Sequence, residues 1–370
     1  MTFTEVLNWL LETDPSRLET LWAEADRVRR EYVGEAVHLR GLVEISNHCV
    51  RLCAYCGLRA ANHLPRYRMT AEEILACAHQ ALSYGYGTVV MQSGEDYGIT
   101  REWMADVIRR LQADTPLAVT LSLGERPDED LAAWREAGAD RYLLRFETSD
   151  RELYERLHPP RPGQERSDRI AILHRLRELG YETGSGVMIG IPGQSYESLA
   201  RDLCLFAELD LDMVGVGPWI AHPDTPLGQE MPLDLPQRGS EAVPVVSGHL
   251  PYPGEVAASA PPVGSSQVPP TEEMTYKVLA LTRLLCPQAN IPSTTALAAL
   301  NQETGRELGL ARGANVIMPN LTPPQCRVLY EIYPDKACLS ETAEVCVSSL
   351  PERLRALGRV PGQGPGGRQR

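Results

Sequence analysis

The stretch HLRGLVEISNHCVRLCAYC, residues 38–56, decides how the rest of the chain is interpreted. Its first half, HLRGLVEIS (38–46), is predicted to be a β-strand, because a short and mostly apolar run is typical of a buried strand. Its second half places Cys49, Cys53 and Cys56 in the turn that follows. A dinucleotide-binding fold would carry glycines of the pattern GxGxxG in this turn. The cysteines therefore argue against that fold and indicate a site that needs a further ligand.

Short apolar runs recur along the chain after this stretch, and each is predicted to be a strand. They are TVVMQS (88–93), LAVTLSL (117–123), RYLLRFE (141–147), GSGVMIGI (184–191), MVGVGPWI (213–220), NIPSTTAL (290–297) and ANVIMPN (314–320). Helical stretches lie between them, and Gly138 and Gly180 stand where a helix C-cap favours glycine. Strands that are apolar at nearly every position indicate a parallel sheet with both faces covered.

Strands that alternate with helices in this number predict an α/β fold, a complete (β/α)8 TIM barrel. An open, doubly wound sheet is the alternative. Residues 1–35 contain two short amphipathic patterns and are expected to form an N-terminal helical cap. The barrel is expected to cover 36–350, and 351–370 to form a C-terminal tail. Residues 232–270 are rich in Pro, Gly and Ser and lack periodicity, so they are predicted to be an extended insertion.

The composition excludes several classes of protein. A net charge of −13 does not suit a nucleic-acid binder, which needs a basic face. The N-terminus lacks an apolar signal region, and no window reaches the roughly 18 apolar residues of a membrane span, so we expect a cytoplasmic protein without membrane contact. In a reducing cytoplasm, cysteine serves metal binding, catalysis or core packing. The isolated cysteines are expected to be core residues; they are Cys77, Cys204, Cys286 and Cys326.

The clustered cysteines form a metal site with one ligand missing. Structural zinc prefers four protein ligands, but no second cysteine pair lies nearby, and His48 is too close to Cys49 in sequence to be a good fourth ligand. A [4Fe–4S] cluster normally takes four thiolates. Three thiolates would leave one iron open to a small molecule. The turn after the first strand also lies at the face of a barrel where active sites occur. We therefore expect a cluster rather than zinc.

CVRLCAYC (49–56) resembles the CxxxCxxC motif of the radical S-adenosylmethionine (SAM) enzymes. The resemblance implies that Cys49, Cys53 and Cys56 hold a [4Fe–4S] cluster and that SAM is the missing ligand. It implies reductive cleavage of SAM to a 5′-deoxyadenosyl radical, for which the cofactors supply the chemistry. Tyr55 matches the aromatic position that lies near the adenine in this family.

Seven further segments resemble the HydE family, the radical SAM maturases of [FeFe]-hydrogenase. They are MQSGED (91–96), LSLGER (121–126), LLRFETS (143–149), LGYETGSGVMIGIPGQ (179–194), MVGVGPWIAHPDTPL (213–227), IPSTTAL (291–297) and RGANVIMPN (312–320). The resemblance implies action on a small, cysteine-bound iron complex with CO and cyanide ligands, Fe(CO)2(CN), on the way to the diiron subcluster. The implied partners are the sister maturases HydG and HydF and a low-potential electron donor.

The same resemblance implies which residues bind SAM. Residues 92–95 (Gln92, Ser93, Gly94 and Glu95) would meet its methionyl amine, where glycine permits a close approach of the backbone. Glu147 would accept hydrogen bonds from SAM. Arg169 would pair with the SAM carboxylate, to which a guanidinium is well suited, although Arg166 is a competitor for this role. Ile191, in the segment GIPGQ (190–194), would lie beneath the adenine.

The substrate is expected deeper in the barrel. The residues implied are Thr120, Arg145, Thr294, Thr295, Met318 and, with weaker support, Tyr333. Side chains alternate along a strand, so Arg145 and Glu147 are predicted to share one face. A buried arginine needs a partner. A bound anion or the nearby carboxylate would each serve.

Some members of the HydE family carry a second cysteine triad near the C-terminus. The matching region, KACLSETAEVCVSSL, retains Cys338 and Cys346 but has Ser349 in the third position. Two thiolates make a poor cluster site, so we expect only one cluster.

The sequence is also compatible with two other functions. One is a HydE-like radical SAM paralogue, similar to biotin synthase or methylornithine synthase, that acts on an organic amino acid or thiol. The other is an iron–sulfur carrier that does not cleave SAM. A carrier would have no use for the SAM-binding residues Glu95, Glu147 and Arg169.

Overall fold

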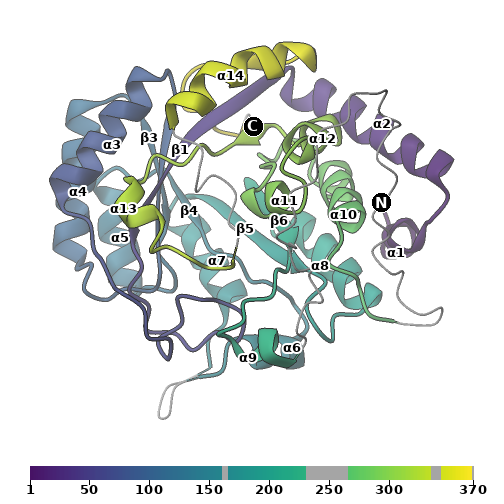
Figure 1. Ribbon diagram of the computed structural model, residues 1–370, viewed down its shortest axis with the longest axis horizontal. Coiled ribbons are helices and arrows are strands. Elements are labelled where there is room, and N and C mark those ends of the chain that lie inside the picture. The colour runs from purple at the N-terminus through teal and green to yellow at the C-terminus, as the bar shows by residue number, and fades with distance from the viewer. Residues whose placement is uncertain (161–165, 231–265, 335–342, 369–370) are drawn as a thin grey trace, which may run out of the picture.

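The computed structural model describes residues 1–160, 166–230, 266–334 and 343–368 (Figure 1). The strands are β1 (Ala36–Ser46), β2 (Thr88–Ser93), β3 (Ala118–Ser122), β4 (Arg141–Leu143), β5 (Glu182–Ile189), β6 (Met213–Pro218), β7 (Val316–Ile317) and β8 (Val360–Pro361). The helices are α1 (Phe3–Leu11), α2 (Pro15–Val33), α3 (Ala71–Ser83), α4 (Arg101–Asp114), α5 (Asp128–Glu136), α6 (Arg151–Leu157), α7 (Arg169–Glu178), α8 (Tyr196–Glu208), α9 (Pro226–Glu230), α10 (Glu272–Leu285), α11 (Thr295–Leu300), α12 (Gly305–Ala311), α13 (Pro324–Arg327) and α14 (Ala343–Ala356).

The strands within these residues form one parallel sheet that curls like part of a barrel. Its order is β6-β5-β4-β3-β2-β1-β7, and β8 pairs with β1 outside this path. Each strand up to β6 is followed by a helix before the next strand begins, and the sheet lies inside these helices (Figure 1). The parallel α/β plan predicted from the sequence is confirmed. The carboxyl ends of the strands lie at one edge, which is where such sheets place their active sites.

The structure confirms a curled parallel sheet covered by helices, but not the predicted complete eight-stranded barrel. The expected strand at 290–297 does not form, and its residues make single bridges from Asn290 to Met213 and from Pro292 to Val316. A physical reason lies in the sequence itself. Proline has no N–H for a ladder, and the side chain of Thr294 accepts a hydrogen bond from the backbone N–H of Leu297 and caps α11. A helix therefore begins where the strand was expected to continue.

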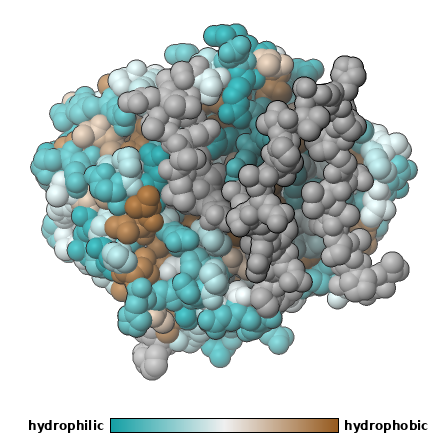
Figure 2. Space-filling model, viewed as in Figure 1, coloured by the Kyte–Doolittle hydropathy of each residue, from teal (hydrophilic) through white to brown (hydrophobic). Residues whose placement is uncertain are grey.

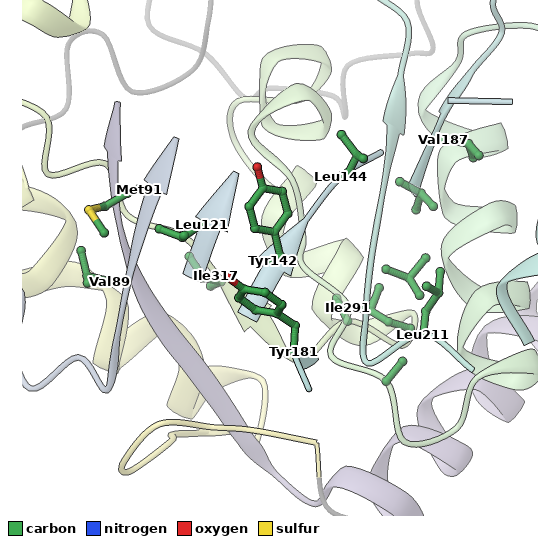
Figure 3. Packing of buried hydrophobic residues seen from close by; sticks show 14 of the residues in the cluster. Val89, Met91, Leu121, Tyr142, Leu144, Tyr181, Val187, Leu211, Ile291 and Ile317 are labelled. Atoms are coloured by element: carbon green, nitrogen blue, oxygen red, sulfur yellow. The ribbon is translucent and has the colours of Figure 1, made fainter. Parts of the chain in front are cut away.

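The core lies between the outer face of the sheet and the surrounding helices. Figure 3 shows alternate strand residues of this layer, such as Val89 and Met91 from β2 and Leu121 from β3. The rings of Tyr142 and Tyr181 meet edge to face with their centroids 5.8 Å apart. The alternate positions of the same strands point to the inside of the curled sheet, where the polar residues of the site are found.

Two helices precede the first strand, in agreement with the helical pattern of 1–35. α1 begins with a capping box between Thr2 and Glu5, and α2 begins with Asp14 as N-cap and Pro15 as first residue. Both are favourable ways to start a helix. α1 packs beside α8, and α2 packs beside α10.

The C-terminal segment crosses the amino ends of the strands. β8 pairs with Ala36 and Val37 at the start of β1. Beyond it, the carbonyl of Pro365 accepts hydrogen bonds from Thr88 and Arg141, and the carbonyl of Gly366 accepts one from Arg40. These donors come from three different strands. The tail therefore covers the end of the sheet opposite the cysteines, which we call the floor.

The face in Figure 2 is mostly hydrophilic, which suits the strongly negative net charge. A small hydrophobic patch lies over the region of α13, whose C-cap residue Val328 is exposed. No helix within the described residues combines the length and the apolar character that crossing a bilayer requires. The predicted insertion at 232–270 lies mostly outside the described residues, which resume at 266.

Candidate active site

The cysteine loop, residues 47–62, follows β1 and is held by backbone hydrogen bonds to several elements. The N–H of Val50 donates to the carbonyl of Glu95 after β2, at 2.9 Å, and the N–H of Ala54 donates to the carbonyl of Leu157 at the end of α6, at 2.8 Å. The N–H of Gly57 donates to the carbonyl of Ile332 at 3.1 Å. The loop is therefore positioned by segments far apart in the sequence.

The three cysteines of this loop are buried or partly buried, and their charges act on one another. Burial raises the pKa of Cys53 to about 12, and the charge of Cys49 acts in the same direction. Burial also raises the pKa of Cys56, with further contributions from Cys49 and Cys53. Thiols in such a group ionise readily only next to a cation.

The arrangement of these thiols does not resemble a site for a single ion. Among the described residues, no three His, Cys, Asp or Glu side chains converge on one position that could hold a metal ion. In an iron–sulfur cluster each thiolate binds a different iron. Three thiolates on one loop are able to bind three different irons.

The turn after β2, which contains residues 92–95, packs directly against the cysteine loop. A Cβ atom on Gly94 would lie 2.3 Å from the carbonyl oxygen of His48 and 2.8 Å from Cβ of Cys49. Any larger residue at this position would displace the loop. Gln92 and Ser93 are partly buried beside it, and Glu95 is buried.

Four charged side chains form a network beside the cysteines, which we call the Arg51 network: Arg51, Glu95, Glu125 and Arg169. Arg51 lies 3.8 Å from Oε1 of Glu95 and 3.2 Å from Oε1 of Glu125. Arg169 donates from Nε to the same Glu125 oxygen at 2.8 Å. The backbone N–H of Glu125 donates to Glu95 at 2.9 Å. The network joins the cysteine loop to the turns after β2 and β3 and to the start of α7.

Burial raises the pKa of Glu95, and the charge of Glu125 acts in the same direction, whereas Arg51 opposes it. Gly124 makes the close approach of these two turns possible. It has a φ of +76°, and a Cβ atom on it would lie 2.8 Å from Cβ of Glu95. The two carboxylates are therefore held together by backbone geometry and by Arg51, which contacts both.

The structure distinguishes the two arginines that competed for one role. Arg169 is 8% exposed, and its NH1 donates to the carbonyl of Arg145 at 2.7 Å. Arg166 has an exposed side chain and pairs with Glu155 at 2.7 Å. Only Arg169 lies in the network beside the cysteines.

Arg145 and Glu147 lie next to each other just beyond β4, which ends at Leu143 and not at residue 147 as predicted. NH2 of Arg145 is 3.1 Å from Oε2 of Glu147. Glu147 is buried and has a φ of 66°, a left-handed conformation that is unfavourable for glutamate and is often found at functional sites. Burial raises its pKa, and the charges of Arg145 and Arg169 oppose that shift.

Tyr55 and Ile191 share an apolar cluster on one side of the loop. Ile191 is fully buried with Met188 and Trp219, and Tyr55 packs against this group. The hydroxyl of Tyr55 lies 3.2 Å from Nε2 of His158. Burial raises the pKa of Tyr55 and lowers that of His158, so both side chains are neutral. The cluster is therefore apolar, with the hydroxyl of Tyr55 and the ring of His158 as its polar edge.

The predicted substrate residues lie on different elements and differ in the contacts of their side chains. The hydroxyl of Thr120 is buried in β3 without a hydrogen-bond partner among the described residues. A Cβ atom on Gly217 of β6 would lie 3.1 Å from the hydroxyl of Thr294. Thr295 and Tyr333 bring their hydroxyls to 3.1 Å. Thr294 and Thr295 belong to the start of α11 and not to a strand, which corrects the prediction.

Met318 is less closely tied to this group. It follows β7 and is partly buried.

Nε of Arg145 and the hydroxyl of Ser293 are further buried polar atoms without a partner among the described residues. Buried polar groups are normally paired, and these atoms remain available to a polar ligand.

Three residues of the site were not expected from the sequence: Arg51, Glu125 and His158. A signal for Glu125 was present, because MQSGED (91–96) and LSLGER (121–126) both place Gly-Glu directly after a strand. No comparable signal pointed to Arg51 or His158. Their contacts are with residues remote in sequence. The expectation of a single cluster rests on Cys338 and Cys346, of which Cys338 lies outside the described residues.

Comparison with known proteins gives a consistent result. The profile of the Radical SAM superfamily matches residues 43–205. The chain is 43% identical over 353 residues to the [FeFe] hydrogenase maturase subunit HydE of Thermotoga maritima, which covers 95% of this chain and 89% of that protein. It is 31% identical to the 3-methylornithine synthase of Methanosarcina acetivorans over 57% of this chain and 59% of that protein.

Solved structures show the same fold. The crystal structure of methylornithine synthase (PylB) has a TM-score of 0.75 at 23% identity and covers 98% of this chain and 94% of that one. The maturase HydG from Carboxydothermus hydrogenoformans has a TM-score of 0.73 at 17% identity, over 98% of this chain and 76% of that one. With the site beside the cysteines and the identity to a HydE protein over nearly the whole chain, the chain belongs to the HydE family of radical SAM enzymes, the maturases of [FeFe]-hydrogenase.

Proposed function

We propose that the chain binds one [4Fe–4S] cluster through Cys49, Cys53 and Cys56 and holds SAM at its open iron. The observation that carries this proposal is the contact of Arg51, a residue of the cysteine loop, with Glu95 and Glu125. Support also comes from the buried, mutually interacting thiols, which favour a cationic partner. When bound, the cluster supplies the electron that cleaves SAM reductively to a 5′-deoxyadenosyl radical.

The residues of the network and its surroundings bind and orient SAM in this proposal. Glu95 and the turn formed with Gln92, Ser93 and Gly94 receive the methionyl amine. Arg169 receives the carboxylate, because a guanidinium can form paired charge-assisted hydrogen bonds with it.

The remaining SAM contacts lie on either side of this network. Glu147 accepts hydrogen bonds from SAM. Tyr55 and Ile191 receive the adenine, because an apolar surface with a polar edge suits a base. These residues also exclude water from the cluster.

The substrate that we propose is the cysteine-bound Fe(CO)2(CN) precursor of the diiron subcluster. Its negative charge and its hydrogen-bonding ligands suit the unpaired polar atoms of Thr120 and Arg145 and the hydroxyls of Thr294, Thr295 and Tyr333. Met318 would complete the apolar part of the lining. Room for a substrate is supported at Gly215, where a Cβ atom would have only a backbone oxygen at 4.0 Å within reach.

The partners that we propose are the sister maturases HydG and HydF and a low-potential electron donor. The support is the family itself, since the 43%-identical relative is a hydrogenase maturase subunit. HydG would supply the iron complex, and HydF would receive the product.

We also propose that the ring of strands is completed without an eighth full strand. The bridges of Asn290 and Pro292 would join β6 to β7, and the N–H of Val214 donates to the carbonyl of Asn290 at 3.0 Å. In this arrangement 36–350 is one barrel domain, with 1–35 as a helical cap and 351–370 as a tail.

A second candidate is a radical SAM enzyme with an organic amino acid as substrate. The 31% identity to a 3-methylornithine synthase favours it, but that match spans little more than half of each chain. The two candidates differ in the substrate alone, because the SAM site is the same.

The experiment that tests the proposal is anaerobic reconstitution with iron and sulfide, followed by EPR of the reduced protein with and without SAM. We expect a [4Fe–4S]⁺ signal that changes on addition of SAM, and 5′-deoxyadenosine as a product. A signal indifferent to SAM would indicate a carrier, and failure to bind any iron would overturn the cluster assignment. Consumption of the cysteine-bound iron complex, but not of ornithine or lysine, would separate the leading candidate from the second.

A further inference from the structure

Arg66 lies in the segment between the third cysteine and α3 and binds the cysteine loop with a single guanidinium. NH1 of Arg66 donates to the carbonyls of Asn47 and Leu58. NH2 donates to the carbonyl of Arg59 at 3.0 Å and to that of Asn62 at 3.1 Å. Asn47 precedes the first cysteine, and the other three residues follow the third. One side chain therefore joins the two ends of the segment that carries the cysteines.

The same part of the loop has little regular structure to hold it. Residues 47–66 contain neither helix nor strand, and the bridge between Ser46 and Arg68 lies just outside them. Within the loop, backbone hydrogen bonds run from Ala60 to Arg51 and from Asn62 to Arg59. A loop without secondary structure depends on side chains to satisfy its carbonyls. Arg66 provides four such bonds, more than any lysine or glutamine could.

The charge of Arg66 is not neutralised by these contacts. Its acceptors are all carbonyls, and no carboxylate among the described residues forms an ion pair with it. The guanidinium also lies near the thiols. Burial lowers the pKa of Arg66, whereas the charges of Cys49 and Cys56 oppose that shift. An arginine stays charged in proteins at neutral pH, so a positive charge is held beside the cysteines.

We propose that Arg66 is a positioning residue for the iron–sulfur cluster, which pre-forms the cysteine loop and raises the reduction potential of the cluster through its unneutralised charge. The inference rests on the proposed function, because it requires the cluster at Cys49, Cys53 and Cys56. Reduction adds a negative charge to the cluster, and a nearby positive charge stabilises the reduced form. The electron donor would then need less driving force to reduce it.

The first test uses the metal-free chain and examines the loop alone. Hydrogen exchange of residues 47–62 is compared among the wild type, Arg66→Lys, Arg66→Gln and the control Arg166→Gln, whose exposed arginine pairs with Glu155. We expect exchange to be at least several times faster in both Arg66 variants, because neither side chain can donate to four carbonyls. The control is expected to match the wild type. Wild-type exchange in both Arg66 variants would overturn the positioning role.

The second test measures the midpoint potential of the reconstituted cluster by EPR-monitored titration without SAM. Arg66→Gln removes the charge and is expected to give a more negative potential than the wild type. Arg66→Lys keeps the charge and is expected to stay closer to the wild type, although its loop is loosened. Equal potentials in all three proteins would overturn the electrostatic role. If Arg66→Gln takes up no iron, the comparison of Arg66→Lys with the wild type decides, and a clearly more negative potential in Arg66→Lys would overturn it.

A failure of the proposed function can be distinguished from a failure of the inference about Arg66. A wild-type chain that forms no cluster would refute the proposed function. A wild-type cluster whose potential and loop are both unaffected by changes at Arg66 would refute the present inference alone.

Discussion

Nε of Arg169 lies 2.8 Å from Oε1 of Glu125, and both side chains are buried. The two residues come from different βα units, the start of α7 and the turn after β3. Because Glu125 also binds Arg51 of the cysteine loop, the orientation of Arg169 is coupled to the loop that carries the cysteines. The arginine that we propose for the SAM carboxylate is thus fixed in advance by Glu125, which would reduce the entropy lost on binding.

The substitution Glu125→Gln tests this coupling. We expect the KM for SAM in 5′-deoxyadenosine formation to rise about tenfold, because hydrogen bonds to charged groups contribute roughly 1.5–3 kcal/mol. The rate at saturating SAM is expected to change less. Glu129→Gln alters an exposed carboxylate of α5 and serves as the control. An unchanged KM in Glu125→Gln would show that Arg169 does not need this partner.

The cysteine assignment predicts a selective loss of iron. Cys53→Ala is expected to abolish cluster formation, whereas Cys204→Ala, at a partly buried thiol of α8, should keep about four irons per chain, the content of one [4Fe–4S] cluster. Iron and sulfide analysis after reconstitution measures both. About eight irons in the wild type would contradict the expectation of a single cluster.

Thr120→Val separates a role in binding from a role in stability. The hydroxyl of Thr120 is buried and unpaired among the described residues, so its removal is expected to leave the melting temperature unchanged or slightly raised. Turnover of the iron complex should fall by about tenfold if the hydroxyl binds it.

Thr115→Val is the matched control for this change. The hydroxyl of Thr115 donates to the carbonyl of Leu111 at 2.9 Å. Its loss should lower the free energy of unfolding by about 1 kcal/mol without affecting turnover. If Thr120→Val lowered the free energy of unfolding and left turnover unchanged, Thr120 would not belong to the substrate site.

Asp202 gives a prediction about pH. Burial raises its pKa to about 7, although hydrogen bonds from Ser149 oppose that shift. The folded chain therefore retains a proton that the unfolded chain releases above its ordinary pKa of 3.8, and stability falls as pH rises from about 4 to about 7. Asp202→Asn should match the wild type near pH 4 and become increasingly more stable than it up to pH 7.

Thermal unfolding at several pH values measures this difference. The exposed Asp114→Asn on α4 is the control and should show no such trend. A constant difference between Asp202→Asn and the wild type at all pH values would contradict the assignment. Asp202 also anchors the backbone of Ser149, two residues from Glu147, so the same variant reports on the support of the strained Glu147.

Much of the fold could be predicted because local pattern and tertiary structure agree. The predicted strands 88–93 and 213–220 appear as β2 and β6 within a few residues. The pattern failed at 290–297, where a threonine able to cap a helix overrode an apolar run. It also could not show β8, a strand of two residues that exists only through its pairing with β1.

The site was predictable where chemistry is encoded in spacing. The cysteines and the Gly-Glu turn after β2 carry such spacing, and the structure brings them together. Arg51 and Arg66 carry none. Their importance comes from contacts across the fold, and an isolated arginine in a loop is indistinguishable in sequence from a solvated one.

The floor, the end of the sheet that the C-terminal tail covers, has a consequence for the order of folding. Arg40 binds the carbonyl of Gly366, a residue 326 positions further along the chain. Contacts of such separation form late, because the entropy of closing a long loop must be overcome first. We therefore expect the tail to dock on the floor only after the strands have paired.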